Sequence, residues 1–118
     1  WELLLPAVAR AVRPNVLLVS AGFDYVAGDI VGDLGVGVEA AHSVASTIRR
    51  VAEEHCGGSV AYILEGGYGI EAIAQSIALI AAVHDAPAVA AGHTDPNAIP
   101  RSVRERVTDF LRFSQGIT

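Results

Sequence analysis

Apolar residues follow two patterns along the chain, one typical of helices and one typical of buried strands. Residues 2–13 repeat apolar positions at helical spacing until Pro14 ends the pattern, and Pro6 fits this helix only at its start or at a bend. The runs 16–20 and 60–64 are short, continuous and apolar, which is typical of strands buried on both faces. Strands of this kind occur in parallel sheets.

Two further helices are predicted, one between the strands and one after them. Residues 38–55 carry a core-facing stripe before Gly57 and Gly58 end the pattern, and residues 70–84 carry a stripe of isoleucines. The order helix, strand, helix, strand, helix predicts an α/β fold whose two parallel strands are joined by a right-handed crossover. The isoleucines are Ile70, Ile73, Ile77 and Ile80.

Beyond this unit the pattern is less regular. Residues 86–100 are rich in Ala, Pro, Gly and Asn, which is typical of a surface loop. A terminal amphipathic helix is predicted to follow the loop. Its apolar face contains Val103, Val107, Phe110 and Leu111, and its opposite face contains Arg104, Glu105 and Arg112.

Two unusual loops leave the carboxyl ends of the predicted strands. Residues 21–37 lack periodicity and are rich in glycine and aspartate, and long strand-to-helix loops are commonly functional. Residues 65–69, Glu-Gly-Gly-Tyr-Gly, follow the second strand. Ligands of open α/β sheets bind outside the carboxyl ends of the strands. Because parallel strands share that edge, both loops are expected to converge on one site.

Composition indicates that the chain is part of a larger domain. Hydrophobic residues make up 52% of its 118 residues, and 12 more are glycines, whereas a domain of this size buries only about 60–65% of the surface of its unfolded chain. The excess is expected to be buried against more of the same protein, with a homo-oligomer as the alternative. The apolar start at Trp1 and the absence of Met favour a C-terminal portion.

Charge and cysteine content exclude several classes of function. The 13 acidic residues outnumber the 8 arginines and give a net charge of −5, which argues against direct binding of nucleic acid through its phosphates. The single cysteine, Cys56, provides neither a disulfide framework nor a thiolate metal cluster and suits a reducing, cytoplasmic location. No apolar run is long enough to cross a membrane.

Asp24 is the first candidate for chemistry. It ends the motif Ser-Ala-Gly-Phe-Asp after the first strand, so its carboxylate is expected to project over the edge of the sheet. There it could ligate zinc, provided that further ligands come from elsewhere. The alternative is an aspartate that caps its own turn. Asp29 and Asp33 do not match the spacing of a calcium loop and are expected to be turn and cap residues.

Tyr68 is the second candidate, because flanking glycines present its ring at the end of a buried strand. Its phenol could donate a hydrogen bond to an oxyanion, or its ring could simply cover the core. Gly66 and Gly67 are expected to supply a positive φ angle or the close approach of a ligand to the backbone. Glu65 is expected to pair with an arginine or to cap a backbone amide.

Two other interpretations stay open. Gly67, Gly69 and Ala72 satisfy a dinucleotide-binding fingerprint after a strand, with Asp85 further on, although that acid does not end a following strand. The four histidines show no zinc-ligand spacing, and His84 is expected to compensate a helix dipole. The chain could therefore also be a structural piece without a complete site.

Several motifs of the chain occur together in one known family. They are Pro14–Asp24, Gly28–Asp29, Gly32–Gly35 and Leu64–Tyr68. Their order and spacing resemble the histone deacetylase family, which includes acetylpolyamine amidohydrolases and acetoin utilisation proteins. The resemblance covers a core at residues 1–84 and leaves a loop and a terminal helix at 85–118. It implies an arginase-deacetylase fold, a three-layer α/β/α sandwich on a mainly parallel sheet, of which this chain is the C-terminal portion.

The resemblance also implies roles for individual residues. Asp24 matches a zinc ligand, Tyr68 matches the tyrosine that hydrogen-bonds the substrate carbonyl and the oxyanion, and Val31 matches a wall of the acyl channel. Gly66 and Gly67 are assigned to substrate binding. The family's Asp-x-His ligand pair and its His-His general-base pair do not occur in this chain and are expected upstream.

The implied activity is zinc-dependent removal of an acetyl group from an N-acetylated amine, such as acetyl-lysine or acetylpolyamine. Its implied partners are the substrate and the missing part of the same domain, with no nucleic acid and no membrane. The 118-residue piece alone is expected to be inactive. Two positions depart from the family pattern. Ile30 stands where a proline is common, and Gly69 stands where an asparagine is common, which loosens the turn that aims Tyr68.

Overall fold

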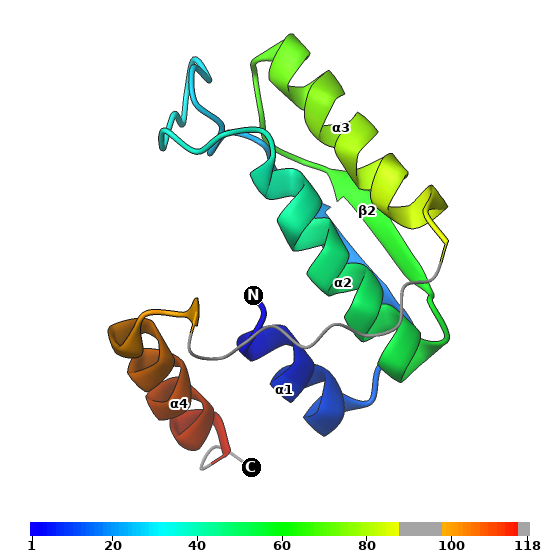
Figure 1. Cartoon of the computed structure of the whole chain (residues 1–118), viewed down its shortest axis with the longest axis vertical. Helices are drawn as coiled ribbons and strands as arrows, with labels where there is room; N and C mark the ends of the chain where they lie inside the picture. Colours follow the sequence, from blue (N-terminus) through cyan, green and yellow to red (C-terminus); the bar gives the residue numbers. More distant parts are fainter. Residues whose placement is uncertain (88–97, 116–118) are drawn as a thin grey trace.

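The computed structural model describes residues 1–87 and 98–115, and it has the predicted α/β order. Helices and strands follow one another as expected from the apolar pattern, and a fourth helix follows after them (Figure 1). Most of the predicted loop at 86–100 lies outside the described residues. The elements are α1 (Leu4–Val12), β1 (Leu17–Ala21), α2 (Ala40–Cys56), β2 (Val60–Leu64), α3 (Ile70–Asp85) and α4 (Arg101–Gln115).

The two strands form a parallel pair, as predicted. Their register runs from Leu17 opposite Val60 to Ala21 opposite Leu64, so both strands end at the same edge. Helix α2 is the crossover between them. Because each strand continues into a loop at that edge, the register alone brings the loop after β1 beside the loop after β2.

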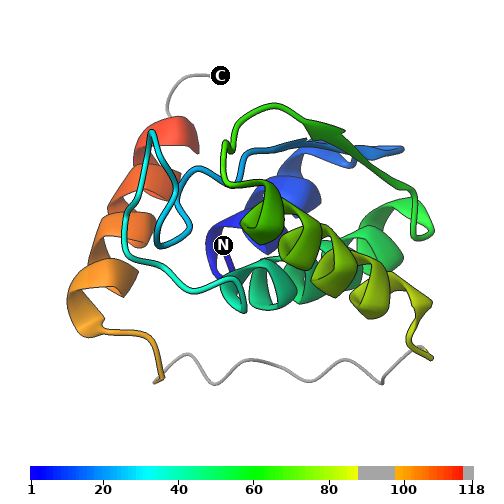
Figure 2. The same cartoon turned by 90° about the horizontal axis from the view of Figure 1, so that it is seen from above.

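Only one face of this sheet is covered by helices. The helices α1, α2 and α3 lie on the same side of the strands (Figure 2). On the other side, Leu18 is 69% exposed and Ile63 is 50% exposed, with Ala61 exposed between them. Parallel sheets normally have both faces covered, so the described residues form two layers of an α/β/α sandwich.

Helix α1 accommodates Pro6 because the proline falls in the first turn. The first N–H groups of a helix have no partner within the helix, so a residue without an N–H is tolerated there. Arg13 then ends the helix in a left-handed conformation, with φ 53°, and its N–H bonds to Ala9 O. Helix α2 ends in the same way at Gly57, with φ 60°. The predicted stop signals are therefore confirmed.

The core is centred on α2, which packs against α1, α3 and the loop after β1. The predicted stripe of α2 is buried, and Val51 beside it is fully buried. The stripe predicted for α3 is partly wrong: Ile70 is 84% exposed and Ile77 is 47% exposed, whereas Ser76 and Val83 are buried. Helix α3 packs on α2 along one face only. That face is centred on Ser76 and Val83, so it lies beside the row of isoleucines and not along it.

A polar contact joins β2 to the end of α3. Tyr62 Oη lies 2.9 Å from His84 Nε2, and burial raises the pKa of Tyr62 to about 12. Burial, followed by the nearby Arg49 charge, lowers the pKa of His84. This shift disfavours the charged form of His84, and the expectation that its charge compensates the helix dipole stays a prediction.

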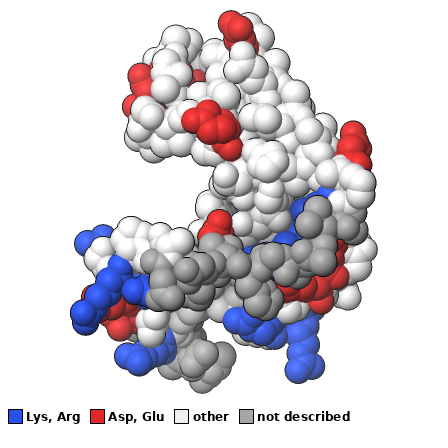
Figure 3. All heavy atoms as spheres, in the orientation of Figure 1, with Lys and Arg blue, Asp and Glu red and all other residues white. Residues whose placement is uncertain are grey.

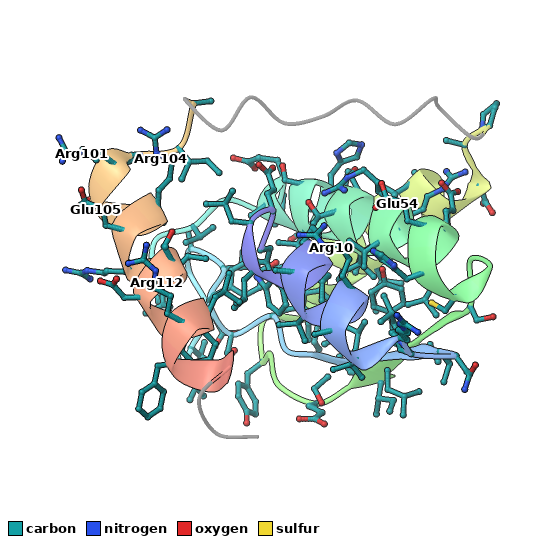
Figure 4. All side chains as sticks on the ribbon, turned by 90° about the horizontal axis from the view of Figure 1, so that it is seen from below. Arg10, Glu54, Arg101, Arg104, Glu105 and Arg112 are labelled. Atoms are coloured by element: carbon teal, nitrogen blue, oxygen red, sulfur yellow. The ribbon has the colours of Figure 1, made fainter. Side chains whose placement is uncertain are left out.

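Helix α4 packs beside α1 at the other end of the molecule. A cavity of about 290 Å³ lies between α1, α2 and α4, with Trp1, Val44 and Val103 among its lining residues, and the space-filling view is hollowed on this side (Figure 3). Glu105 and Arg112 are exposed on α4 as predicted, whereas Arg104 is half-buried (Figure 4). Arg101 pairs with Glu105 at 2.7 Å. The predicted apolar face is only half-buried, because Phe110 remains 54% exposed.

We expect Ser76→Ala to stabilise the protein. Ser76 is fully buried in α3, and its Oγ has no hydrogen-bond partner among the described residues. A buried polar group without a partner costs about 1–3 kcal/mol, so the free energy of unfolding should rise by about that amount in a urea titration. Ser46→Ala is the matched control, since Ser46 Oγ donates to His42 O at 2.8 Å in α2. An equal gain in both variants would point to helix propensity alone.

Candidate active site

The loops after β1 and β2 meet just beyond the ends of the strands. Glu65 N donates to Ala21 O at 3.1 Å, and Phe23 N donates to Gly66 O at 3.0 Å. These bonds extend the parallel pairing by one step past the sheet. The expectation that both loops lie at one edge is therefore met.

The Asp24 carboxylate lies against Gly66 in this junction. A Cβ built on Gly66 would be 3.2 Å from Asp24 Oδ2 and 3.3 Å from Asp24 Cγ, which is tighter than an ordinary contact. Glycine at position 66 thus makes room for this carboxylate. Asp24 is half-buried, and no described residue donates a hydrogen bond to its carboxylate.

Gly67 turns the chain between that contact and Tyr68. Its φ is +113°, a conformation that residues with a Cβ rarely adopt, and a Cβ there would be 3.1 Å from Phe23 Cβ and 3.2 Å from Ile73 Cγ1. The positive φ foreseen for these glycines therefore occurs at Gly67. At Gly66 the close neighbour is the Asp24 side chain, so the approach of a ligand to this backbone stays a prediction. Substrate binding by either glycine stays a prediction.

Tyr68 stands at the amino end of α3 with a 52% exposed side chain. It leaves the same edge of the sheet as Asp24, as the parallel strand ends require. About half of Tyr68 faces solvent, so its ring covers the core at most in part. The phenol is therefore free to contact a ligand placed at this edge.

The loop after β1 is folded on itself. Val26 and Val36 form an isolated parallel bridge, and Ala27 N donates to Val36 O at 2.8 Å. Val31 lies at the outer part of this loop and is 67% exposed. Its neighbour Gly32 is pressed against the Asp24 backbone, since a Cβ there would be 2.2 Å from Asp24 O. Val31 is thus held near Asp24, and its contact with an acyl chain stays a prediction.

Asp29 is the residue of this site that the sequence pattern undervalued. It is 6% exposed. Its Oδ1 accepts from the N–H groups of Val31 at 2.9 Å and Gly32 at 3.1 Å, as a turn residue would. Its Oδ2 accepts from Tyr68 N at 2.7 Å and Gly69 N at 3.1 Å. The turn role is confirmed, but the same carboxylate also reaches the second loop.

The other two acidic residues of these loops have local roles. Asp33 Oδ1 accepts from Gly35 N at 3.1 Å, which confirms the expected turn role. Glu65 Oε1 accepts from Ser20 Oγ at 2.8 Å on the uncovered face of the sheet. The expected arginine pair or amide cap of Glu65 is therefore wrong, because the side chain turns back over β1.

Comparison with known proteins assigns the chain to a family. The profile of the histone deacetylase domain matches residues 1–84. The chain belongs to the histone deacetylase domain family. That range includes both loops, so Asp24, Asp29 and Tyr68 all lie within the family domain.

Individual relatives agree with this assignment. Histone deacetylase 10, chloroplastic, of Oryza sativa is 36% identical over 111 residues, which cover 90% of this chain and 25% of the relative. Histone deacetylase 14, chloroplastic, of Arabidopsis thaliana is 38% identical over 65% of this chain and 18% of its own length. Polyamine deacetylase HDAC10 of Homo sapiens is 38% identical over 66% of this chain and 11% of its own length.

The chain thus spans a quarter or less of the length of these relatives. The names of two relatives place them in chloroplasts, so a cytoplasmic location stays a prediction. None of the helices in residues 1–87 and 98–115 has the length and apolar character needed to span a membrane.

Among the residues of the described site, the Asp24 carboxylate has the chemistry of a single metal ligand. In residues 1–87 and 98–115, no three His, Cys, Asp or Glu side chains lie together as a metal-binding group. The Asp24 carboxylate nevertheless suits a ligand, since it is partly open, sits at the carboxyl end of a strand and carries no competing donor. A carboxylate oxygen is one of the ordinary protein ligands of zinc.

The arrangement disfavours the dinucleotide interpretation. A pyrophosphate bound by that fingerprint sits on the N–H groups at the start of the helix. Here the N–H groups of Tyr68 and Gly69 already bind the Asp29 carboxylate. Moreover, Asp85 is the last residue of α3 and not the end of a strand. The family assignment accounts for the glycines without a nucleotide.

We expect Asp29 to make stability depend on acid pH. The four backbone N–H donors, that of Tyr68 foremost, lower its pKa from 3.8 to about 2. A carboxyl group whose pKa is lower in the folded state stabilises the fold above its unfolded pKa, and this contribution is lost as pH falls from about 4 to about 2. Free energies of unfolding measured across this range should fall for the natural chain and fall less for Asp29→Asn. If the free energy of unfolding falls equally with pH in both proteins, Asp29 is not the source of the pH dependence.

Proposed function

We propose that this chain is the C-terminal portion of a zinc-dependent deacetylase domain that hydrolyses an N-acetylated amine. The observation that carries the proposal is the meeting of the Asp24 carboxylate and the Tyr68 loop at one sheet edge, across the Phe23–Gly66 bond. Membership of the histone deacetylase domain family supports it. The names of the relatives favour acetylated histones or polyamines as substrates.

Each of the two side chains has a separate task in this proposal. Asp24 would hold the zinc ion together with ligands from outside the chain, and zinc polarises a carbonyl group and lowers the pKa of bound water. Tyr68 donates its phenolic proton as a hydrogen bond to the carbonyl oxygen of the acetamide. That oxygen gains negative charge when water attacks, so the bond strengthens toward the transition state. Val31 borders the acyl group.

The reaction is completed by residues outside this chain. Water forms a new C–O bond, the amide C–N bond breaks, and the proton released by water passes to the leaving amine through a general base. No histidine of the described residues lies in the loops that form the site, since His42 and His55 are on α2 and His84 is in the last turn of α3. The proposal therefore needs a general base from the rest of the domain.

The uncovered face of the sheet supports the need for more of the same domain. Leu18, Ala61 and Ile63 form an apolar strip there, at the centre of what would be a three-layer fold. We infer that the remaining part of the domain covers this strip and brings its own metal ligands and base to the same edge. A strip of this kind is not left open to water in a complete parallel sheet.

Tyr68→Phe should lower kcat of the complete domain by about 10²–10³, with zinc content unchanged. The variant removes one hydrogen-bond donor to the oxyanion, and losses of this size are usual for such donors. Hydrolysis of acetyl-lysine peptides and of acetylpolyamines would be followed side by side. Tyr62→Phe is the control, because the Tyr62 phenol contacts His84 in the last turn of α3, at the opposite end of that helix from Tyr68. If Tyr68→Phe leaves kcat unchanged, Tyr68 does not take part in the reaction.

Asp24→Asn should abolish tight zinc binding and activity in the complete domain. An amide oxygen is a far poorer zinc ligand than a carboxylate, and carboxylate, histidine and thiolate are the usual set. Metal content would be measured on the purified variant by mass spectrometry. Asp33→Asn makes the same charge change in the same loop and should retain both metal and turnover. A zinc-free natural protein without amidase activity would favour the structural interpretation instead.

A further inference from the structure

A single buried carboxylate joins the two loops that carry the candidate site. Asp29 is only 6% exposed, yet it belongs to the loop after β1 and contacts the loop after β2. A buried charge is tolerated when hydrogen bonds satisfy it. Four backbone N–H groups do so here, and each carboxylate oxygen accepts two of them.

The two oxygens are divided between the loops. Oδ1 accepts from Val31 and Gly32, which belong to the same loop as Asp29 and lie next to Asp24. Oδ2 accepts from Tyr68 and Gly69, about forty residues further along the chain. A planar carboxylate has a fixed separation between its oxygens. It therefore sets the spacing of the two backbone segments that it binds.

On the Tyr68 side, this carboxylate is the main polar anchor. Tyr68 lies between two glycines, and its half-exposed side chain has no hydrogen bond to its hydroxyl group within the described residues. The direction of the side chain is then set by the backbone. The 2.7 Å bond from Tyr68 N to Asp29 Oδ2 fixes the peptide unit from which that side chain leaves.

On the Asp24 side, the Asp29 carboxylate binds the backbone segment that packs against Asp24. Gly32 N donates to Asp29 Oδ1 at 3.1 Å, and the Gly32 Cα lies so close to Asp24 that a Cβ would be 2.2 Å from Asp24 O. A shift of the 31–32 backbone would therefore press on Asp24 or leave it unsupported.

We propose that Asp29 is a positioning residue that sets the placement of the Tyr68 phenol relative to the Asp24 carboxylate. The proposal rests on the proposed function, because it assigns the spacing of these two groups to the deacetylation reaction. Asp33 is a comparison case, because it is a turn aspartate that does not connect the two loops. It is in the same loop, is exposed, and accepts from Gly35 N within its own turn.

The variant Asp29→Asn separates the two halves of the contact. The local Asx turn favours an asparagine whose amide oxygen accepts from Val31 and Gly32. Its NH₂ group then faces the N–H donors of Tyr68 and Gly69 and cannot accept from them. The turn is kept and the bond between the loops is lost. We expect kcat of the complete domain to fall about 10–100-fold with KM and zinc content nearly unchanged, because small misplacements of catalytic groups cost up to about 10²-fold.

A double-mutant cycle distinguishes positioning from general damage. If Asp29 acts through Tyr68, then Asp29→Asn has little further effect on kcat once Tyr68→Phe has removed the phenol. If the fold of the site is simply weakened, the two losses multiply, and this outcome would overturn the proposal. Asp33→Asn is the matched control for charge and should leave kcat unchanged in both backgrounds.

Hydrogen exchange provides a readout that does not depend on activity. In the complete domain, Asp29→Asn should increase exchange of the Tyr68 and Gly69 amides while those of β1 and β2 stay protected. Unchanged protection at Tyr68 and Gly69 would overturn the proposal even if activity falls. If Asp29→Asn does not fold, Asp29→Glu keeps both acceptors but lengthens the arm, and a fall in kcat with bound zinc is then the supporting result.

The outcomes also separate this proposal from the proposed function. A natural domain that binds no zinc and hydrolyses no acetylated amine would defeat the proposed function, whereas the exchange experiment would still decide whether Asp29 holds the Tyr68 loop. A natural domain that is active, with Asp29→Asn equally active, would defeat the positioning role and leave the proposed function standing.

Discussion

The arrangement of the site depends on the need to satisfy a buried carboxylate. Asp29 lies between two glycine-rich loops, and its four backbone partners come equally from both. Moving either loop would leave a buried charge short of donors, which is costly in a low-dielectric environment. This one requirement ties the backbone of Tyr68 to the loop that carries Asp24, although the two residues are far apart in the sequence.

The strands supply the second constraint. The last residues of the two strands, Ala21 of β1 and Leu64 of β2, are paired with each other. Both loops therefore begin at the same edge of the sheet. Gly66 and Gly67 then serve the contact between the loops, one by leaving space for the Asp24 carboxylate and one by turning the chain against Phe23. The need for glycine at each position thus comes from a residue of the loop after β1, Asp24 in one case and Phe23 in the other.

The described helices leave one face of the sheet uncovered. Helices α1, α2 and α3 bury one face of the sheet, and the apolar strip on the other face stays exposed. The exposed isoleucines of α3, Ile70 and Ile77, add to the apolar surface. The chain spans a quarter or less of the length of these relatives, and the proposed function assigns the second helical layer to the rest of the domain.

The sequence by itself determined the order of the elements, the parallel pair and the two loops at one edge, because apolar periodicity, Pro14 and Gly57 act locally. It also singled out Asp24 and Tyr68, through motifs that stand directly after strands. Only the tertiary structure decided that Asp29 bridges the loops, that His84 contacts Tyr62, and that Ile70 faces outward. Those outcomes depend on which distant groups become neighbours, and no pattern along the chain records that.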